Sequence, residues 1–315
     1  MRKPRIIFMG TPELGSTILE KLITSRIYAP ELVITQQDKP VGRAHLLTPP
    51  PVRVYAESHT IEVWQPTKLR DQEMIDRIRK WAPDIIIIAA YGKIIPQEII
   101  DIPTYGILNV HTSLLPRHRG ASPIQSAILS GDQETGVTIM RIDAGLDTGP
   151  IVSQRSLAIS PDETTETLTR KLAACGADLL IETLPQWLSG EITSQPQQDA
   201  HATLTKIFKK EDGEIHKEHT AEQIERMIRA LTPWPGVFIT LRDKKEEKKM
   251  LKILRTRVAP CIPTLQPLTL SLRDMPDGEK ELILHTEDGC LMLDSVQPEG
   301  KNPMSGHAFW LGYRG

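Results

Sequence analysis

The chain has 315 residues, which is enough for one large domain or two domains of ordinary size. Its formal net charge is −2, with 25% charged and 39% hydrophobic residues, a composition that excludes a disordered or fibrous protein. No apolar stretch approaches the roughly 20 residues of a membrane span, and the basic start lacks the apolar core of a signal peptide. We therefore expect a soluble, cytoplasmic protein without a membrane partner.

Three cysteines, Cys175, Cys261 and Cys290, lie far apart in the sequence. An odd number of widely spaced cysteines is typical of a reducing compartment and predicts no disulfide framework. Because the sequence contains neither a Cys-x-x-Cys nor a His-x-x-x-His pair, we expect no structural zinc site and no metal.

The first half of the chain alternates strand and helix patterns. Strands are predicted at residues 5–10, 31–35, 85–89, 107–111 and 137–142 from their apolar runs. Helices are predicted at residues 12–23, 51–58, 71–81, 122–130 and 163–189, the last of them kinked at Pro185. This alternation predicts an α/β fold with a Rossmann-like, doubly wound sheet over residues 1–190.

The second half of the chain changes pattern. Residues 191–206 are polar and predict a linker. A helix is predicted over residues 220–230, and short apolar runs follow at residues 237–241, 250–254, 268–272, 282–285 and 290–293. Several short strands separated by turn residues predict a smaller, OB-like β-barrel domain over residues 207–315.

Three side chains with proton-handling chemistry fall at the ends of predicted strands. Asn109 and His111 are two apart on one strand, so they lie on the same face of the sheet. Asp147 lies in a glycine-rich loop after the strand at 137–142. Each residue alone is typical of a turn or a core, but ligands of parallel sheets bind beyond the carboxyl ends of the strands. Their common placement there predicts an active site.

The surrounding residues form a longer motif. Asn109-x-His111 is followed by Ser-Leu-Leu-Pro at 113–116, Arg-Gly at 119–120 and Asp-x-Gly-x-Asp-Thr-Gly at 143–149. This segment resembles the formyltransferases that use 10-formyltetrahydrofolate, and among them those that act on methionyl-tRNA. The resemblance extends over nearly the whole chain, including residues 8–13, 37–43, 90–92, 138–140 and 229–236. It implies transfer of a formyl group from 10-formyltetrahydrofolate to the amino group of methionine on initiator methionyl-tRNA, for translation initiation.

The three polar residues suit this chemistry. An amine that attacks a formamide carbon produces a tetrahedral oxyanion, so the reaction needs a donor for that oxygen and groups that move protons. Asn109 offers an amide donor, His111 offers a second donor or a proton carrier, and Asp147 can hold and charge-stabilise His111. A nucleophilic serine is not required, and Ser113 lacks the glycine-flanked elbow of a serine hydrolase.

Binding residues follow from the resemblance. It implies that the folate is contacted by Ser113, Leu114, Leu115 and Pro116. It implies that the pterin pocket is lined by the backbone near Ala90, Tyr91 and Gly92. The only cofactor expected is thus the folate co-substrate.

The same resemblance implies contacts to tRNA from both domains. In the long loop at 36–51 it indicates Lys39 and Arg43, although Ala44-His45-Leu46-Leu47 follows where related loops often carry further lysines. Residues 206–257 carry 14 Lys and Arg against 9 Asp and Glu, an electrostatic footprint for a polyanion. There we expect contacts from Lys206, Lys209, Lys210 and the Lys244–Lys252 cluster. The stretch from Lys244 to Lys249 can also be interpreted as a solvated hairpin tip. We expect a monomer.

Three alternatives remain open. Residues 10–15 suggest an NAD-dependent oxidoreductase, but Gly-x-Gly-x-x-Gly is absent and Pro12 stands in the turn. A non-catalytic RNA-binding module leaves Asn109, His111 and Asp147 unexplained. Formyl transfer to an amino sugar or a glycinamide nucleotide, or hydrolysis of formyl-folate, stays within the same chemistry, and the C-terminal domain and the loop of Arg43 favour tRNA.

Overall fold

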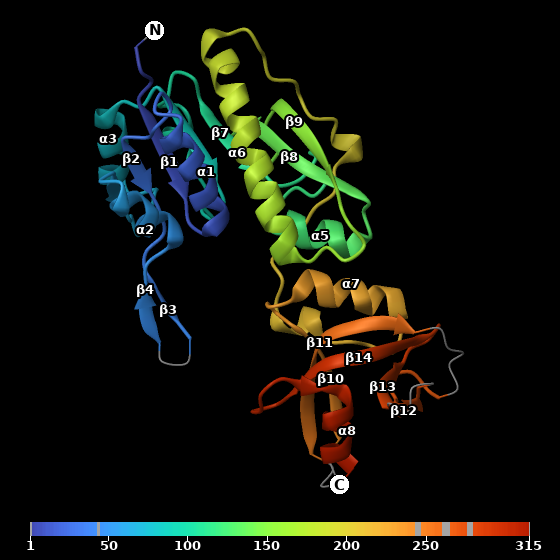
Figure 1. Ribbon diagram of the computed structural model, residues 1–315. Coiled ribbons are helices and arrows are strands. Elements are labelled where there is room, and N and C mark those ends of the chain that lie inside the picture. Colours follow the sequence, from blue (N-terminus) through green and yellow to red (C-terminus); the bar gives the residue numbers. More distant parts are fainter. Residues whose placement is uncertain (1, 43–44, 243–246, 260–264, 276–279, 315) are drawn as a thin grey trace. The chain divides into compact units, whose positions relative to one another are not determined.

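The computed structural model describes residues 2–42, 45–242, 247–259, 265–275 and 280–314 (Figure 1). The chain divides into two compact units. Unit 1 comprises Met1–Ile124, Gln133–Ile159 and Glu166–Lys206. Unit 2 comprises Gln125–Asp132, Ser160–Thr165 and Ile207–Gly315, so two short segments of the first half complete the C-terminal unit.

Unit 1 is built around a seven-stranded sheet in the order β5-β2-β1-β6-β7-β8-β9. Its strands are β1 (Ile6–Gly10), β2 (Leu32–Ile34), β5 (Glu62–Trp64), β6 (Ile85–Ala89), β7 (Ile107–His111), β8 (Glu134–Arg141) and β9 (Ile151–Ala158). The strands β5, β2, β1, β6 and β7 are parallel to one another, whereas β8 is antiparallel to both β7 and β9. The prediction of a Rossmann-like α/β domain is confirmed.

Helices cover this sheet, and every residue of β1, β6 and β7 is buried as a result. They are α1 (Glu13–Thr24), α2 (Pro51–Ser58), α3 (Gln72–Trp81), α4 (Gln97–Ile100) and α6 (Thr165–Ser189), while α5 (Pro123–Ser130) lies mostly in unit 2. On one face, Ile75 and Ile78 of α3 share a hydrophobic cluster with Ile7 and Met9 of β1. The helical spacing of the α3 residues and the alternation on β1 explain why they meet.

Helix α6 approaches β7 and β8 closely because it presents a glycine to them. A Cβ on Gly176 would lie 2.8 Å from Cγ1 of Val110 and 3.3 Å from Cγ1 of Val137, so a larger residue would push the helix away. Val110 therefore faces α6, and its neighbours Asn109 and His111 face the opposite side of the sheet. Figure 1 shows α6 alongside these strands.

From the sequence, we expect Asp147 beyond the carboxyl end of a parallel strand. This expectation is wrong, because β8 is antiparallel to β7. On β8, Thr138 lies opposite His111 and Arg141 lies opposite Leu108. The carboxyl end of β8 is thus beside the amino end of β7, and the following loop must turn back to bring Asp147 near His111. The apolar pattern of a strand predicts its burial and not its direction, which explains the error.

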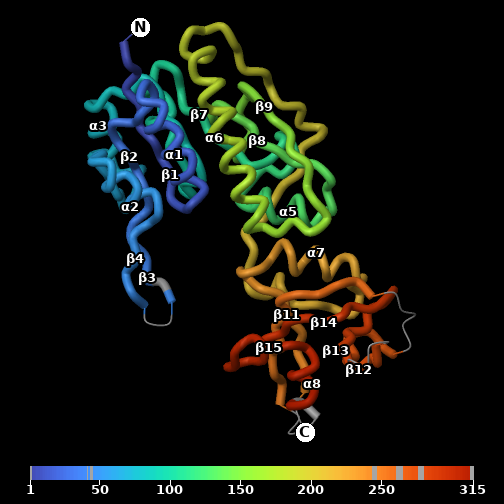
Figure 2. Tube along the Cα trace, in the orientation of Figure 1, coloured from blue at the N-terminus to red at the C-terminus, as the bar shows by residue number. Residues whose placement is uncertain are grey.

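The predicted linker, residues 191–206, belongs to unit 1. Gln195 exchanges backbone hydrogen bonds of 2.7 and 2.8 Å with Ile151 of β9, and the backbone N–H of Arg119 donates to the carbonyl of Thr203 at 2.8 Å. The segment contains the short 3-10 helix η1 (Asp199–His201), and Figure 2 follows its path back from the end of α6. Backbone hydrogen bonds thus hold this segment against the rest of unit 1.

Unit 2 contains an antiparallel sheet in the order β10-β11-β14-β13-β12, with β15 paired to β14. Its elements are η2 (Lys210–Gly213), α7 (Ala221–Leu231), β10 (Val237–Arg242), β11 (Lys248–Ala259), β12 (Leu270–Asp274), β13 (Lys280–His285), β14 (Cys290–Pro298), β15 (Met304–Ser305) and α8 (Gly306–Arg314). Thr220 and Gln223 form the capping box that begins α7. The prediction of a β-rich C-terminal domain is confirmed, and α8 is an addition to it.

Two further expectations can be compared with the structure. Cys175 is a free thiol, and Cys261 lies outside the described residues, so the expectation of a chain without a disulfide framework stays a prediction. Among the residues that the structure describes, no helix is both long and apolar enough to cross a bilayer.

Candidate active site

Asn109 and His111 lie near the carboxyl end of β7. They are buried, with 9% and 6% of their surface exposed. β7 is paired with β6 on one side and β8 on the other, which fixes its backbone. The two side chains share one face of the sheet, as their spacing predicts.

The two ring nitrogens of His111 face different groups. Nε2 lies 3.0 Å from the carbonyl oxygen of His118, and because a carbonyl can only accept, Nε2 carries a hydrogen. Nδ1 lies 3.7 Å from Oδ2 of Asp147, and only 7% and 15% of these two side chains is exposed. That distance exceeds a hydrogen bond, but it places the carboxylate beside the imidazole in a poorly solvated place. Nδ1 is therefore the nitrogen that can gain or lose a proton beside a carboxylate.

A backbone donor fixes the carboxylate of Asp147. The N–H of Gly120 donates to its Oδ2 at 2.8 Å. Asp147 has a φ of 51°, a left-handed conformation that Asp tolerates better than most residues. Within the same loop, Oδ1 of Asp143 accepts from the N–H of Gly145 at 3.0 Å and from Oγ1 of Thr148 at 2.8 Å. The Asp-x-Gly-x-Asp-Thr motif thus builds a loop that aims Asp147 at His111.

The loop after β7 is held by internal hydrogen bonds. The hydroxyl of Ser113 donates to the carbonyl of Arg117 at 2.6 Å. Oγ1 of Thr138 donates to the carbonyl of Ser113 at 2.7 Å and accepts from the N–H of Leu115 at 3.1 Å. The Ser113 hydroxyl therefore shapes the turn. The folate contacts of Ser113, Leu114, Leu115 and Pro116 stay predictions.

The other predicted folate segment, Ala90–Gly92, leaves the sheet beside this loop. In the register of β6 and β7, Ile88 pairs with Asn109, so this segment leaves β6 at the end of the sheet where His111 lies. The carbonyl of Tyr91 accepts hydrogen bonds from Nε2 of Gln36 at 2.7 Å and Oγ1 of Thr11 at 3.1 Å. The loops after β1, β6 and β7 thus meet at one edge of the sheet, where parallel sheets bind ligands. The pterin contact stays a prediction.

The residues predicted to contact tRNA lie in two places. In unit 1, β3 (Lys39–Val41) and β4 (Leu46–Thr48) form an antiparallel hairpin. Nζ of Lys39 donates to Oε1 of Gln36 at 2.7 Å, and Arg43 lies outside the described residues. Lys206 ends unit 1, and Lys209 and Lys210 are exposed at the start of unit 2, by η2. Lys244 and Lys245 also lie outside the described residues.

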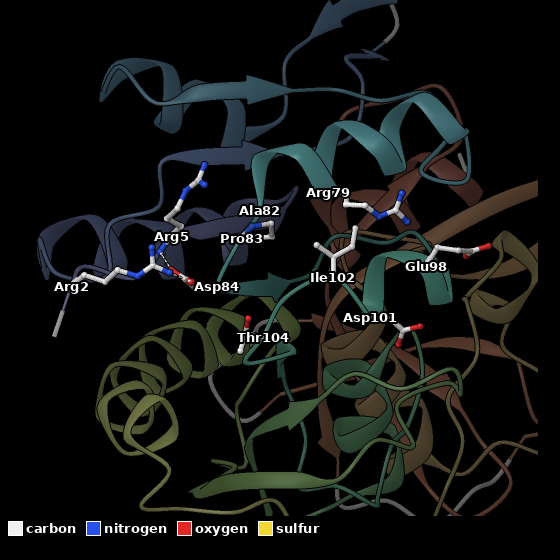
Figure 3. Close-up of a pocket in the computed structure, with 10 residues that line it drawn as sticks. All are labelled: Arg2, Arg5, Arg79, Ala82, Pro83, Asp84, Glu98, Asp101, Ile102 and Thr104. Carbon is white, nitrogen blue, oxygen red and sulfur yellow. Dashed lines mark hydrogen bonds and ion pairs between the residues drawn. The ribbon is translucent and has the colours of Figure 1, made fainter.

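A cavity of about 470 Å³ opens at the amino-terminal ends of the strands. Figure 3 shows it lined by residues that precede β1, β6 and β7, among them Arg5, Asp84 and Thr104. Arg2 pairs with Asp84, and Arg79 pairs with Asp76. The cavity lies before the strands begin, so it is separate from the site at the carboxyl end of β7. In the described ranges, no group of three or more His, Cys, Asp or Glu side chains is placed to hold a metal ion.

Comparison with known proteins places the chain in a family. The family model for formyl transferase matches residues 4–184, and the model for the formyl transferase C-terminal domain matches residues 207–314. A methionyl-tRNA formyltransferase of Myxococcus xanthus is 43% identical over all of this chain and 96% of its own length. The chain belongs to the methionyl-tRNA formyltransferase family. A relative with the same name from Geotalea daltonii is 42% identical over 98% of this chain and 96% of its own length.

Solved structures show that the fold of this methionyl-tRNA formyltransferase family member also occurs in more distant proteins. WlaRD, a sugar 3N-formyl transferase, covers 96% of this chain with a TM-score of 0.64 and 18% identity, and this chain covers all of it. HypX from Aquifex aeolicus in complex with tetrahydrofolic acid covers 99% of this chain with a TM-score of 0.62 and 16% identity. The chain spans about half the length of HypX.

The structure adds residues to this candidate site that the sequence did not indicate. Gln197 and Thr203 lie in the predicted linker, and both make hydrogen bonds within the loops around Asp147 and His118. His118 contacts His111 through its backbone, which any residue type could do. Because these contacts join residues about 50 to 85 positions apart in the chain, no local spacing pattern could have found them.

Proposed function

We propose that the protein transfers the formyl group of 10-formyltetrahydrofolate to the amino group of methionine on initiator methionyl-tRNA. The proposal is supported by the relationship to methionyl-tRNA formyltransferases over the whole chain. The observation that carries it in the structure is the His111–Asp147 pair beside Asn109, at the edge where the loops of β1, β6 and β7 meet. The same geometry gives each of these residues a role in acyl transfer.

In the proposed reaction the amine nitrogen attacks the formyl carbon, and a new C–N bond forms while the carbonyl π electrons move to oxygen. The Asn109 amide donates a hydrogen bond to this oxyanion. Nδ1 of His111 takes the proton of the attacking amine, because Nε2 already carries the hydrogen given to His118. The nitrogen that holds this proton lies 3.7 Å from Oδ2 of Asp147. Collapse of the intermediate breaks the bond to the folate nitrogen, which receives the proton.

The folate and the tRNA are proposed to contact different parts of the chain. The backbone of Ala90–Gly92 and the loop of Ser113–Pro116 offer donors and acceptors for a flat heterocycle. The hairpin of β3 and β4 is proposed to position the acceptor end of the tRNA, with exposed Leu46 and Leu47 at its surface. The exposed lysines Lys209 and Lys210 fit phosphate contacts. We further propose that residues 1–190, together with the segment 191–206 that belongs to unit 1, form the catalytic domain and that residues 207–315 form the tRNA-contacting domain. We also propose a cytoplasmic location and a monomer.

The direct test mixes the protein with 10-formyltetrahydrofolate and charged initiator tRNA, and follows N-formylmethionine after hydrolysis of the ester. Parallel reactions contain an amino sugar nucleotide, glycinamide ribonucleotide or no acceptor. We expect formylation of the methionyl-tRNA and none in the parallel reactions, with His111→Ala as the inactive control. Faster transfer to a small amine, or release of formate without an acceptor, would contradict the proposal.

A further inference from the structure

One glutamine in the predicted linker joins the loop of Asp147 to a buried arginine. Nε2 of Gln197 donates both of its hydrogens, to the carbonyls of Asp147 at 2.8 Å and Gly149 at 2.7 Å. Its Oε1 accepts from Nε of Arg119 at 2.9 Å. Every polar atom of the Gln197 side chain is thus engaged, and its amide has only one orientation that satisfies these partners.

Hydrogen bonds hold both the side chain and the backbone of Arg119. Only 5% of its surface is exposed, and its Nη2 donates to Oδ1 of Asp199 at 2.7 Å. Its backbone N–H donates to the carbonyl of Thr203, and its carbonyl accepts from the N–H of Thr205 at 2.7 Å. Asp199, Thr203 and Thr205 come from the same segment as Gln197, so this segment forms a rigid anchor for the glutamine.

The neighbours of Arg119 complete a closed ring of contacts around the site. The carbonyl of His118 accepts from His111, and the N–H of Gly120 donates to the carboxylate of Asp147. Residues 118–120 therefore hold the imidazole and the carboxylate directly. Through Gln197, the same short segment also holds the backbone of Asp147, which is needed because that residue has a left-handed φ of 51°.

We propose that Gln197 is a positioning residue for the formyl-transfer reaction, which fixes the backbone of Asp147 so that its carboxylate lies next to His111. The inference rests on the proposed function, since it concerns the same site. It assigns to the segment 197–205 a part in the catalytic domain's active site. Loss of the two donated hydrogen bonds would remove the support of the backbone at Asp147 and Gly149 and loosen the approach of the carboxylate to His111, although the N–H of Gly120 would still donate to Asp147.

The experiment compares two substitutions of Gln197 with one of Gln195. Gln197→Leu removes all of the side-chain contacts. Gln197→Glu keeps an acceptor for Arg119, but it replaces the donors to the loop with a carboxylate oxygen that faces the two carbonyls. Gln195 is exposed and holds the segment to Ile151 through its backbone, so Gln195→Leu is the matched control. Each protein is assayed with 10-formyltetrahydrofolate and methionyl-tRNA for kcat and both KM values, and is melted to confirm that it folds.

We expect both Gln197 variants to lose about 10- to 100-fold in kcat while both KM values change by less than about 3-fold, as for a small misplacement of a catalytic group. Gln195→Leu should stay within about 2-fold of the wild type. In an Asp147→Ala background, Gln197→Glu should cost less than about 2-fold more, because it acts through the residue already removed.

Three results would overturn the inference. The first is a Gln197→Glu protein with the kcat of the wild type, and this variant decides the matter if Gln197→Leu does not fold. The second is the same loss with and without the Asp147 carboxylate, which would show a general structural role. The third is a wild-type protein that does not formylate methionyl-tRNA, which refutes the proposed function and this inference together.

Discussion

Gly120 offers the sharpest test of how the carboxylate of Asp147 is held. Its φ is 112°, and a Cβ at this position would lie 2.8 Å from Oγ1 of Thr205 and 2.9 Å from its carbonyl oxygen. Ordinary contacts begin at 3.4 Å. In Gly120→Ala the new Cβ and the carbonyl oxygen of Thr205 must therefore move apart by roughly 0.5 Å or more. Thr205 cannot yield easily, because its N–H donates to Arg119 and its Oγ1 accepts from Ser122.

The displaced backbone carries the N–H that donates to Asp147 at 2.8 Å. A shift of this size stretches that bond past the normal hydrogen-bond range. We expect single-turnover formylation to slow by about 10- to 100-fold, and the backbone strain to lower the free energy of unfolding by about 1–3 kcal/mol.

Gly190→Ala is the matched control. Gly190 also has a positive φ, of 78°, but a Cβ there would meet no atom within 4 Å. It should lose roughly 1–2 kcal/mol of stability from the left-handed conformation alone and keep the wild-type rate. Rates come from rapid-quench formylation of methionyl-tRNA, and stabilities come from thermal melting. A wild-type rate in Gly120→Ala, or an equal loss of rate in Gly190→Ala, would refute the reasoning.

Three further predictions follow from the structure. His111→Ala and Asp147→Ala should each reduce turnover by roughly 10²-fold, and the double variant should be far less impaired than the product of the two, because they act as a unit. Lys210→Ala should weaken tRNA binding and lower the slope of log affinity against log salt by about 1, measured by filter binding, whereas an unchanged slope excludes a phosphate contact. Burial lowers the pKa of His285 below its ordinary 6.5, so the unfolded chain binds more protons, and chemical denaturation should show stability falling as the pH drops through 6.5; His285→Gln should reduce that fall.

The amino-acid sequence by itself determined the type of each domain and the face of β7 that carries Asn109 and His111. Uninterrupted apolar runs such as Ile85–Ala89 become buried strands because their composition suits a sheet that is covered on both faces. Asn109 and His111 share a face because a two-residue spacing on a strand leaves no other choice. These features depend on neighbours in the chain, and for that reason the sequence alone predicts them.

Only the tertiary structure decided how the parts of the site are joined. The antiparallel direction of β8 follows from its partners. The carboxyl end of β8 therefore lies beside the amino end of β7, and the loop of Asp147 must turn back to reach His111. Gln197 belongs to a polar segment whose composition is typical of a linker, yet it supports the backbone of Asp147, 50 positions away. Hydrogen bonds across such separations depend on where folding places each backbone group, and no periodicity in the chain records that position.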